Sequence, residues 1–437
     1  NIIFIQLESF FDVGYEKNLQ FSEDPLPVFH SLQKKYSSGL VTVPTVGAGT
    51  VNTEFEILTG MRQHDFGVSE YPYKTVLKSK TSESICTDLK KLGYSTHAVH
   101  NNEATFYGRN TVFSNIGFDT FCSMEYMNGL TDSPNGWSND DVLSREIMKT
   151  LDSTSGPDFT MAITVQSHGK YDGIALDDPT IKVTGAPERK EQAYEYYVNE
   201  IHEVDRMIDT LIKELSNRKE ETVLVLYGDH LPSLDIQKDD LSNANLYQTQ
   251  YVVWDNMNLK KKTKNLHAYQ LYAEVLDRIQ IHEGMITKYH QQTKHRSKLY
   301  LTGLTTLSYD LLYGDNYAYD GENPFKQTEL QMGTEPVKLT SVQKTKSGYR
   351  VVGSGFTPYC KVYYDGTLVE SEWISSGCLQ LQDEFELDEA DKKDSGEPET
   401  EVTEPRDVPN AFVVEVQSDD GVVLSSTQAY PASQVKK

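Results

Sequence analysis

Long apolar runs alternate with helical patterns over most of this chain, and four of the runs end in polar residues. The runs are NIIFIQLE, YSTHAVH, FTMAITVQSH and TVLVLYGDH, and they end at Glu8, His100, His168 and the pair Asp229–His230. Continuous apolar runs of this kind predict buried strands of a mostly parallel sheet. Because open α/β sheets bind ligands beyond the carboxyl ends of their strands, we expect these polar ends to form one site. That arrangement favours an enzyme.

The segments between these runs carry helical periodicity. The longest, 191–215, places its apolar residues on one helical face: Tyr194, Tyr197, Val198, Ile201, Val204, Ile208, Leu211, Ile212 and Leu215. The other predicted elements are helices over 81–92 and 267–279, a helix beginning at a Ser138–Asp141 capping box, and a strand over 249–254. This alternation predicts an α/β domain over residues 1–320, with a mostly parallel central sheet flanked by helices.

A different pattern follows residue 320. Residues 321–336 are polar, with glycine and proline, and are predicted to form a linker. Residues 337–437 hold short alternating segments separated by turns such as Asp365–Gly366, which is typical of a small Ig-like β-sandwich. Within it, residues 383–407 carry 12 acidic and 3 basic residues, so we expect a solvated loop, with calcium binding as the alternative.

Length and charge limit the functions that remain open. A chain of 437 residues is too long for one core, which agrees with two domains. Its net charge of −24 argues against a nucleic-acid partner and would repel an anionic substrate unless a divalent cation reversed the local charge. No apolar stretch approaches the roughly 20 residues that cross a bilayer. Since the chain opens inside a strand at Asn1, we expect a longer protein with an N-terminal membrane anchor.

The four cysteines show no metal-ligand spacing. Cys86 and Cys122 lie among apolar residues and are expected to be core thiols. Cys360 and Cys378 lie on neighbouring predicted strands, where a disulfide and two free thiols both remain open.

The glycine-flanked segment GAGTVNTEFEILTG, residues 47–60, is a second candidate for chemistry. Its apolar residues recur at helical spacing and Gly60 can end the helix, so Thr50 is expected at or near a helix N-terminus. The free N–H groups and positive dipole end there favour a phosphate. A threonine hydroxyl needs a metal or a base to become a nucleophile, and an ordinary N-cap is the alternative role for Thr50.

The strand ends and this threonine supply a mixed set of metal ligands. Asp229 and His230 are adjacent at the end of one predicted strand, and Glu8 ends another. Together with Thr50 they offer carboxylate, hydroxyl and imidazole groups, which suit Mn²⁺, Mg²⁺ or Zn²⁺. The absence of thiolates from this set disfavours a structural zinc site.

Four segments in this order carry a resemblance to a known family: IQLESF, GTVNTEFEILTG, HNNEATFYGR and LYGDHLP. Over about residues 1–320 the chain resembles the lipoteichoic acid synthase family, within the sulfatase and alkaline phosphatase superfamily. The C-terminal β domain is not part of the resemblance. The resemblance implies an alkaline phosphatase/sulfatase-like fold for the first domain, located on the extracellular face of the cytoplasmic membrane.

The resemblance also implies a metal site and a reaction. In that family a glutamate on the first strand, a threonine and an Asp-His pair hold one Mn²⁺, which implies the ligands Glu8, Thr50, Asp229 and His230 here. The family threonine attacks the phosphorus of phosphatidylglycerol, releases diacylglycerol and forms a glycerophospho-threonine intermediate. A hydroxyl of a polyglycerolphosphate or glycolipid acceptor then takes the glycerophosphate. The implied activity is that of a phosphoglycerol transferase in lipoteichoic acid-type synthesis.

His100, Arg109 and His168 match the family's substrate contacts, so the resemblance implies catalytic roles for them beside Thr50. An arginine suits bidentate contact with a phosphate, and a histidine can hydrogen-bond the phosphate or protonate a leaving alkoxide. The best-known family members carry an aspartate and a tryptophan where this chain has Asn102 and Tyr107. The exact headgroup is therefore left open.

Three other functions compete with this one. A sulfatase is disfavoured, because the chain has no C/S-x-P-x-R string for formylglycine formation. A related phosphodiesterase or phosphoethanolamine transferase would use the same metal ligands and stays open. A non-catalytic wall-binding protein is disfavoured by the intact set of four ligands. The remaining histidines His282, His290 and His295 lack a place at a strand end and are predicted to be surface residues.

Overall fold

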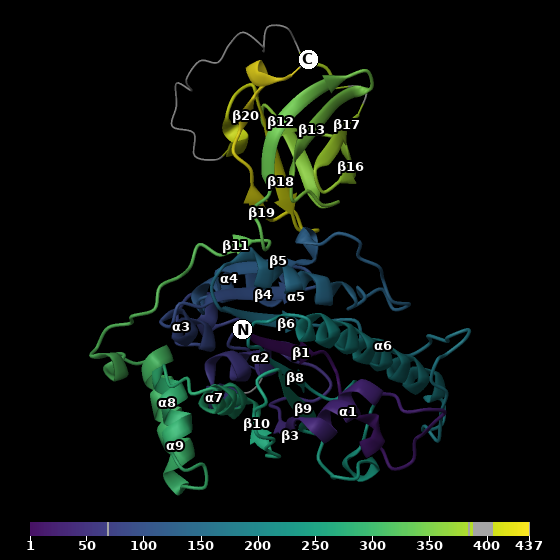
Figure 1. Ribbon diagram of the computed structural model, residues 1–437, viewed down its shortest axis with the longest axis vertical. Coiled ribbons are helices and arrows are strands. Elements are labelled where there is room, and N and C mark those ends of the chain that lie inside the picture. Colours follow the sequence, from purple (N-terminus) through teal and green to yellow (C-terminus); the bar gives the residue numbers. More distant parts are fainter. Residues whose placement is uncertain (68–69, 383–384, 388–404, 437) are drawn as a thin grey trace. The chain divides into compact units, whose positions relative to one another are not determined.

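The computed structural model describes residues 1–67, 70–382, 385–387 and 405–436, and its contacts divide the chain into two compact units. The first unit comprises Asn1–Asn101, Phe106–Asp119 and Thr131–Leu330, and the second comprises Asn102–Thr105, Thr120–Leu130 and Gln331–Lys437. Figure 1 shows helices and strands together in the first unit and mainly strands in the second. Most of the predicted acidic loop, 383–407, lies outside the described residues.

A sheet of mostly parallel strands forms the centre of the first unit, in the order β10-β3-β9-β8-β1-β6-β4. The strands are β1 (Ile2–Leu7), β3 (Ser37–Thr42), β4 (Ser95–His100), β6 (Asp158–Ile163), β8 (Val223–Gly228), β9 (Gln248–Asp255) and β10 (Leu266–His267). β1, β6 and β8 are buried along their whole length, as their continuous apolar runs predicted. Within this order, β9 runs antiparallel to both of its neighbours.

Helices cover both faces of this sheet. Successive side chains of a strand point to opposite faces, so the strand residue that contacts a helix shows which face that helix covers. Gln6 of β1 donates a hydrogen bond of 3.2 Å to the carbonyl of Thr50, the first residue of helix α2 (Thr50–Thr59). Thr160 of β6, which lies opposite Ile3, faces the other way. Its hydroxyl is 2.7 Å from that of Thr150 in helix α5 (Val142–Ser153), so α2 and α5 lie on opposite faces.

Most helices follow the predicted periodicity. The long helix α6 (Glu191–Ser216) packs on α5 and on α1 (Pro27–Lys35), while α7 (Ala268–Arg278) packs on α2. Helix α3 (Ile85–Lys90) is shorter than the predicted 81–92, because the Ser84 side chain caps its start. The predicted Ser138–Asp141 capping box is not formed. Asp141 precedes α5 in helical conformation without a side-chain cap, and the Ser138 carbonyl accepts a hydrogen bond from Asn101.

The last helices of the first unit are α8 (Met285–Gln292) and α9 (Lys298–Leu312), which contact each other at its periphery (Figure 1). His290 of α8 was predicted at the surface but is buried, because the ring bonds to the Tyr300 hydroxyl at 2.7 Å and the Gly60 carbonyl at 2.8 Å. Among the described residues, no helix combines the length and apolarity that a membrane span requires. The remaining elements of this unit are β2 (Gln20–Phe21), β7 (Val183–Thr184) and α4 (Arg109–Asn115).

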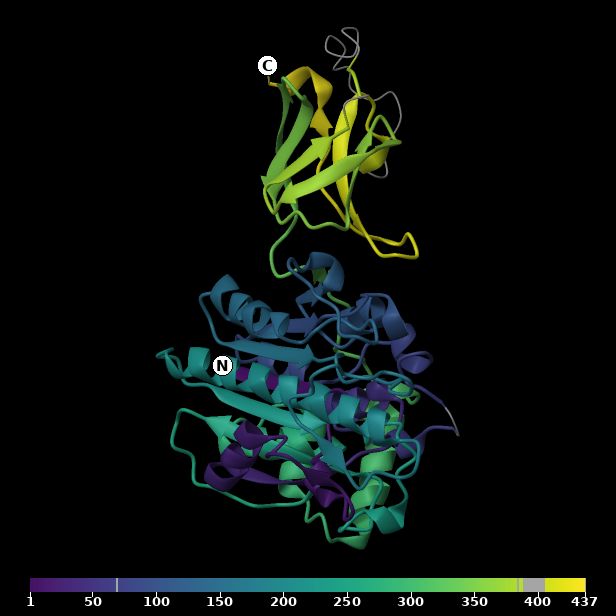
Figure 2. The ribbon, with the colours of Figure 1, turned by 90° about the vertical axis from the view of Figure 1, so that its right-hand side faces the viewer.

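Two antiparallel sheets face each other in the second unit, as Figure 2 shows. One contains β12 (Lys338–Thr345), β13 (Gly348–Ser354), β17 (Cys378–Leu381) and β16 (Ser371–Ser375). The other contains β15 (Thr367–Val369), β14 (Cys360–Tyr364), β18 (Ala411–Gln417), β19 (Val423–Ser426) and β20 (Tyr430–Pro431). The predicted Asp365–Gly366 turn joins β14 to β15. In the same unit β5 (Thr120–Ser123) pairs in parallel with β11 (Gln331–Met332), which comes from the stretch predicted as a linker.

None of the four cysteines forms a disulfide in the described part of the chain. Cys86 and Cys122 are buried in the core, as predicted. Cys360 lies on β14 and Cys378 on β17, which belong to different sheets, so the disulfide that the sequence left open is not formed.

Candidate metal centre and active site

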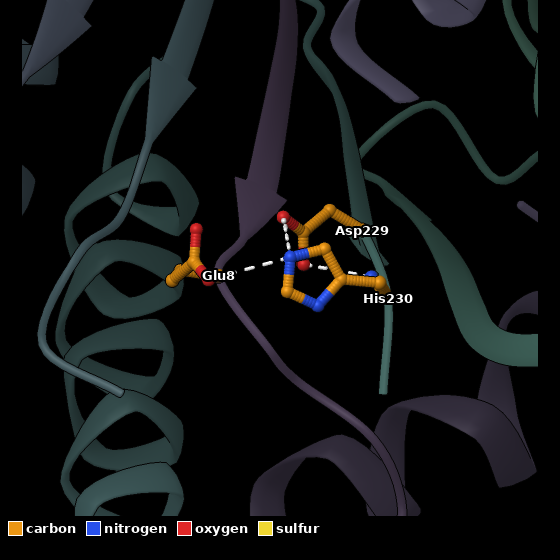
Figure 3. Close-up of side chains that lie close together, drawn as sticks. All are labelled: Glu8, Asp229 and His230. Atoms are coloured by element: carbon orange, nitrogen blue, oxygen red, sulfur yellow. Dashed lines mark hydrogen bonds and ion pairs between the residues drawn. The ribbon is translucent and has the colours of Figure 1, made fainter. Parts of the chain in front are cut away.

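Two neighbouring strands bring three metal-ligating side chains together. β1 and β8 pair in parallel with Leu7 opposite Gly228, so the next residues, Glu8 and Asp229, leave the sheet side by side. One ligand atom from each of Glu8, Asp229 and His230 lies within 4.8 Å of the others. His230 Nε2 is 3.6 Å from Glu8 Oε1 and 3.4 Å from Asp229 Oδ2, and Figure 3 shows the three side chains turned toward one another.

Two buried atoms of this cluster, Asp229 Oδ2 and His230 Nε2, have no hydrogen-bond partner among the described residues. Asp229 Oδ1 is occupied, since it accepts the backbone N–H groups of Ser9 at 2.8 Å and His230 at 2.7 Å. His230 Nδ1 is 2.9 Å from the Leu231 carbonyl, which assigns the ring proton to Nδ1 and leaves Nε2 as an acceptor. Because buried polar atoms are rarely left unpaired, this donor set fits a divalent cation.

The electrostatics of the cluster also fit a cation. Burial, with a contribution from the Glu8 charge, raises the pKa of Asp229 to about 8. Burial acts to lower the pKa of His230, but the neighbouring carboxylates of Asp229 and Glu8 outweigh it and the pKa is raised. A bound divalent cation would reverse the local charge and favour ionised carboxylates. Carboxylate and imidazole donors without thiolate suit Mn²⁺, Mg²⁺ or Zn²⁺.

Thr50 faces this cluster from the start of α2. The residue before it, Gly49, is the N-cap, with a φ of 95° that glycine tolerates and other residues rarely adopt. Thr50 is therefore not the ordinary N-cap that its sequence context left open. Its Oγ1 donates a hydrogen bond of 2.9 Å to Glu8 Oε2, and the residue is buried. The positive end of the α2 helix dipole favours an anionic group at this position.

Arg109, at the start of α4, is buried and held by Glu54 of α2. Its Nε and Nη2 donate to Glu54 Oε2 at 3.2 and 3.0 Å. Its Nη1 is buried and has no partner within the described chain. Burial acts to lower the pKa of Arg109, but the ion pair with Glu54 raises it, so the guanidinium keeps its charge. Glu54 thus fixes the side of the guanidinium that carries Nε and Nη2, and Nη1 is available to an anion.

Tyr107 forms an aromatic rim beside Arg109. Its ring centre lies 5.5 Å from the guanidinium carbon of Arg109, and it stacks on Tyr71 with 6.2 Å between ring centres. Lys74 Nζ lies 5.0 Å from the same ring. Asn102 belongs to the second unit, where its carbonyl accepts the backbone N–H of Met124 at 3.1 Å.

His100 ends β4, as predicted, and its ring is buried. Its Nδ1 is 2.9 Å from the Ile163 carbonyl. Burial, together with the nearby charge of Arg109, lowers the pKa of His100 well below its usual range. His100 is therefore neutral at neutral pH, with the proton assigned to Nδ1 and Nε2 able to accept a hydrogen bond or a proton.

His168 does not end a strand, contrary to the prediction. β6 ends at Ile163, because the backbone N–H groups of Val165 and Gln166 turn toward the Asp140 carboxylate, at 2.9 and 3.3 Å. His168 follows in the next loop, half-buried, with its ring centre 4.5 Å from that of Trp137. Its Nδ1 is 2.6 Å from the Gly169 carbonyl.

Sequence reasoning missed the residues that hold the cluster in place. The Thr53 hydroxyl donates to the Asp229 carbonyl at 2.7 Å, and the Ser167 hydroxyl donates to the Glu8 carbonyl at 2.5 Å. Glu54, which fixes Arg109, was missed as well. Helical spacing was the available signal, since Thr53 and Glu54 follow Thr50 by three and four positions and share its face of the helix.

The chain belongs to the sulfatase family, whose model matches residues 1–321. A putative cyclic β-1,2-glucan modification protein of Rhizobium meliloti is 30% identical over 280 residues, which are 60% of this chain and 43% of the relative. Lipoteichoic acid synthase 2 of Bacillus subtilis is 23% identical over 197 residues, which are 44% of this chain and 30% of the relative. The chain thus spans less than half the length of these curated relatives.

Two solved structures share the fold. The phosphoglycerol transferase GacH of Streptococcus pyogenes, in complex with sn-glycerol-1-phosphate, has a TM-score of 0.63 at 22% identity, covering 75% of this chain and 90% of that chain. The lipoteichoic acid synthase LtaP of Listeria monocytogenes has a TM-score of 0.53 at 20% identity, covering 64% of this chain and 72% of that chain. The predicted fold class and the resemblance to the lipoteichoic acid synthases are confirmed.

Proposed function

We propose that this chain is a metal-dependent phosphoglycerol transferase in which Thr50 is the nucleophile. The observation that carries the proposal is the position of Thr50 Oγ1, 2.9 Å from Glu8 Oε2, while Glu8 itself shares a cluster with the unpartnered atoms of Asp229 and His230. These four residues would hold one Mn²⁺, with Mg²⁺ or Zn²⁺ as alternatives. The bound ion lowers the pKa of a ligating hydroxyl and stabilises charge on a transferring phosphoryl group.

In the first half-reaction the Thr50 oxygen bonds to the phosphorus of a phosphatidylglycerol-type headgroup and passes its proton to Glu8 Oε2, which accepts its hydrogen bond at 2.9 Å. The bond from phosphorus to the diacylglycerol oxygen breaks, and that oxygen takes up a proton as it leaves. Arg109 Nη1, which is buried and unpartnered within the described chain, contacts a phosphate oxygen. His168, half-buried beside Trp137, is the residue to which we assign delivery of the proton.

In the second half-reaction an acceptor hydroxyl attacks the same phosphorus, the bond from phosphorus to the Thr50 oxygen breaks, and Thr50 takes its proton back from Glu8. His100 suits the role of base, because it is neutral and presents an accepting Nε2. The acceptor we propose is a polyglycerolphosphate chain or a glycolipid at the outer face of a cytoplasmic membrane. A glucan hydroxyl is a second candidate, supported by the relative described as a glucan modification protein. Sulfatase activity is not proposed, since the chain lacks the C/S-x-P-x-R string.

Mass spectrometry of protein incubated with phosphatidylglycerol tests the nucleophile. We expect a glycerophosphate adduct on the Thr50 peptide of the wild type and of Thr50→Ser, and none on Thr50→Val. Phosphatidylethanolamine in a parallel incubation tests the related transferase, since a phosphoethanolamine adduct alone would assign that activity instead. Lipid turnover by Thr50→Val at the wild-type rate would overturn the assignment of Thr50.

Direct metal binding tests the cluster without turnover. We expect electron paramagnetic resonance to detect bound Mn²⁺ in the wild type and only background binding in Asp229→Asn. Asp205→Asn is the matched control, because Asp205 is also buried but accepts the backbone N–H groups of Val28 and Phe29 in α1. Equal Mn²⁺ binding by the two variants would remove Asp229 from the ligand set.

A further inference from the structure

The outer face of helix α9 presents a stripe of leucine, threonine and tyrosine to solvent. The helix buries Tyr300, Leu304, Ser308, Leu311 and Leu312. Its exposed stripe runs through Leu299, Thr302, Thr306, Tyr309 and Tyr313, which recur every three or four residues and so share one face. Leu299 is 74% exposed and Tyr309 is 63% exposed. Asp310 shares this face and is half-exposed, and its carboxylate accepts the backbone N–H groups of Tyr317 and Ala318 at 3.0 and 2.9 Å. In a chain with a net charge of −24, an exposed helical face made mainly of leucine, threonine and tyrosine calls for an explanation.

The polar atoms of this stripe do not make it hydrophilic. The Thr306 hydroxyl donates to the Thr302 carbonyl at 2.9 Å within the helix, which leaves its methyl group facing outward. The rings of Tyr309 and Tyr313 lie 5.9 Å apart. Tyr317, just beyond the helix, is 76% exposed. Leucine with several tyrosines is the composition found where protein surfaces meet the headgroup layer of a membrane, because each ring has an apolar body and a polar tip.

A basic surface borders the stripe. Lys294, Arg296 and Lys298 are exposed and immediately precede Leu299. A hollow of about 600 Å³ is lined by Lys262, Lys264, Lys294 and Arg296, with Glu274 and Asp277 as its acidic lining residues. A second hollow of about 660 Å³ is lined by Lys264, Arg296 and Leu301 of α9. The shared residues make the basic surface and the first turn of α9 continuous.

We propose that α9 and the basic segment before it dock on an anionic lipid bilayer. Leu299, Tyr309 and Tyr313 enter the headgroup layer, and the basic side chains contact lipid phosphates. The helix is about 22 Å long at 1.5 Å per residue, so the stripe can lie flat along a membrane surface. This docking rests on the proposed function in one respect, because the proposed reaction consumes a membrane lipid and so requires the protein to be near a membrane.

Charge and apolarity together favour a bilayer over other occupants. A soluble polyanion would contact Lys294, Arg296 and Lys298 but leave the Leu299–Tyr313 stripe uncovered. An anionic bilayer matches both parts, because it offers phosphates and an apolar layer a few ångströms apart.

The docking face is connected to the helix that carries Thr50. Tyr313 contacts Phe66 with 6.2 Å between ring centres, and Phe66 packs edge-on against Phe55 of α2 at 5.3 Å. A surface held at the membrane through α9 therefore keeps α2 at a fixed distance from the lipid layer, which suits an enzyme whose substrate is a headgroup.

Vesicle sedimentation tests the proposal independently of turnover. The vesicles contain phosphatidylserine, an anionic lipid outside the proposed reaction, and pure phosphatidylcholine vesicles serve as the neutral comparison. We expect binding to the anionic vesicles that weakens at high salt. Leu299→Glu and Tyr309→Glu should each weaken it about tenfold. The triple variant Lys294→Gln, Arg296→Gln, Lys298→Gln should weaken vesicle binding roughly a hundredfold.

Matched controls separate docking from general changes in charge. Leu92 and Tyr247 are 45% and 50% exposed elsewhere in the first unit, so Leu92→Glu and Tyr247→Glu should leave binding unchanged. The triple variant Lys219→Gln, Lys238→Gln, Lys346→Gln, at three exposed lysines, is the control for the basic segment and should leave binding unchanged. Thr50→Val should bind vesicles as the wild type does, so a failure of the proposed chemistry and a failure of docking are distinguishable.

Three results would overturn the proposal. The first is binding that is absent, or that falls equally in the control variants. The second is a wild-type dimer in analytical ultracentrifugation that Leu299→Glu converts to a monomer, which would show that a second copy covers the stripe. The third is binding of soluble polyphosphate that depends on Lys294 and Arg296, with no vesicle binding, which would assign the hollows to a polyanion.

Discussion

Both ends of helix α2 carry a buried threonine, but the polar groups around the two ends differ in their hydrogen bonding. All of its residues, Thr50–Thr59, are buried. At the C-terminal end the polar groups are paired: the Thr59 hydroxyl donates to the Phe55 carbonyl at 2.7 Å, and the Gly60 carbonyl accepts from His290 at 2.8 Å. At the N-terminal end Thr50 leads to a cluster with unpartnered atoms. The paired end stabilises the fold, and the unpaired end is available for chemistry.

The pKa values of two histidines, one beside each end of α2, differ in the same way. His230 and His290 are 2% and 3% exposed. Burial lowers the pKa of His290 to about 4, although a hydrogen bond to Gly60 opposes it. The pKa of His230 is raised instead, since the two carboxylates beside it outweigh burial. An unpaired buried polar group costs about 1–3 kcal/mol, so the unpartnered Nε2 of His230 points to a function rather than to stability.

The largest expected effects come from exchanging each histidine for glutamine. In His230→Gln, turnover should fall about a thousandfold or more, because the proposed ion loses a ligand. The free energy of unfolding of the metal-free protein should fall by only about 1 kcal/mol, through the one hydrogen bond from Nδ1 to the Leu231 carbonyl. In His290→Gln, that free energy should fall by about 2 kcal/mol through two lost hydrogen bonds, while turnover per folded molecule is retained.

Urea denaturation in a chelator and initial rates on folded protein measure both quantities. The comparison fails if His230→Gln is as destabilising as His290→Gln and retains turnover. It also fails if His290→Gln abolishes turnover without loss of stability.

The next effect compares two glutamates of α2. Glu54→Gln leaves the buried Arg109 charge uncompensated, which should cost about 3–5 kcal/mol of stability. If Glu54 positions Arg109, the affinity for inorganic phosphate should also fall. Glu56→Gln is the control two residues away, where burial raises the pKa of Glu56 to about 8. That carboxyl is largely protonated at pH 7, so glutamine replaces it with little change.

Isothermal titration with phosphate and urea denaturation at pH 7 give the two readouts. Glu54→Asp should recover part of the phosphate affinity, because it restores the charge. Loss of stability in Glu54→Gln with unchanged phosphate affinity would leave Glu54 a purely structural role.

A third effect concerns pH. The pKa of His290 is about 4 in the folded protein against an ordinary 6.5. As the pH falls through this interval, the unfolded chain binds a proton that the folded protein does not, so the free energy of unfolding falls. The loss of stability due to His290 is at most about 3 kcal/mol: it is absent above pH 7 and complete only below about pH 4.

Urea denaturation of the wild type and of His290→Gln across this interval isolates the contribution. The difference in stability between the two proteins should shrink as the pH falls from 7 to 4. A difference that stays constant, or grows, would contradict a low pKa for His290.

The strand ends that form the Glu8–Asp229–His230 cluster were predictable, and the partners of α2 were not. Glu8 and Asp229 follow buried strands, and parallel strands place their ends at one edge whatever the loops do. Glu54 and Arg109 are 55 residues apart, and His290 and Gly60 are 230 apart. Their contacts depend on how distant segments pack, which local periodicity does not encode. His168 shows the same limit, since the Asp140 carboxylate ends β6 before it.

The smallest effect compares two threonines of α2. Thr53 donates to the Asp229 carbonyl and Thr59 to the Phe55 carbonyl, both at 2.7 Å, and both residues are fully buried. Valine at either position keeps the shape. Thr53→Val removes one hydrogen bond and should lose about 1 kcal/mol of stability, whereas Thr59→Val removes two, because the Thr59 hydroxyl also accepts the Met61 N–H at 3.1 Å, and should lose about 2 kcal/mol. Only Thr53→Val should weaken Mn²⁺ affinity, by about tenfold, because it releases the backbone of a proposed ligand. Equal Mn²⁺ affinity in the two variants, measured by calorimetric titration, would mean that α2 does not hold Asp229 in position and that its ends differ less than their hydrogen bonds indicate.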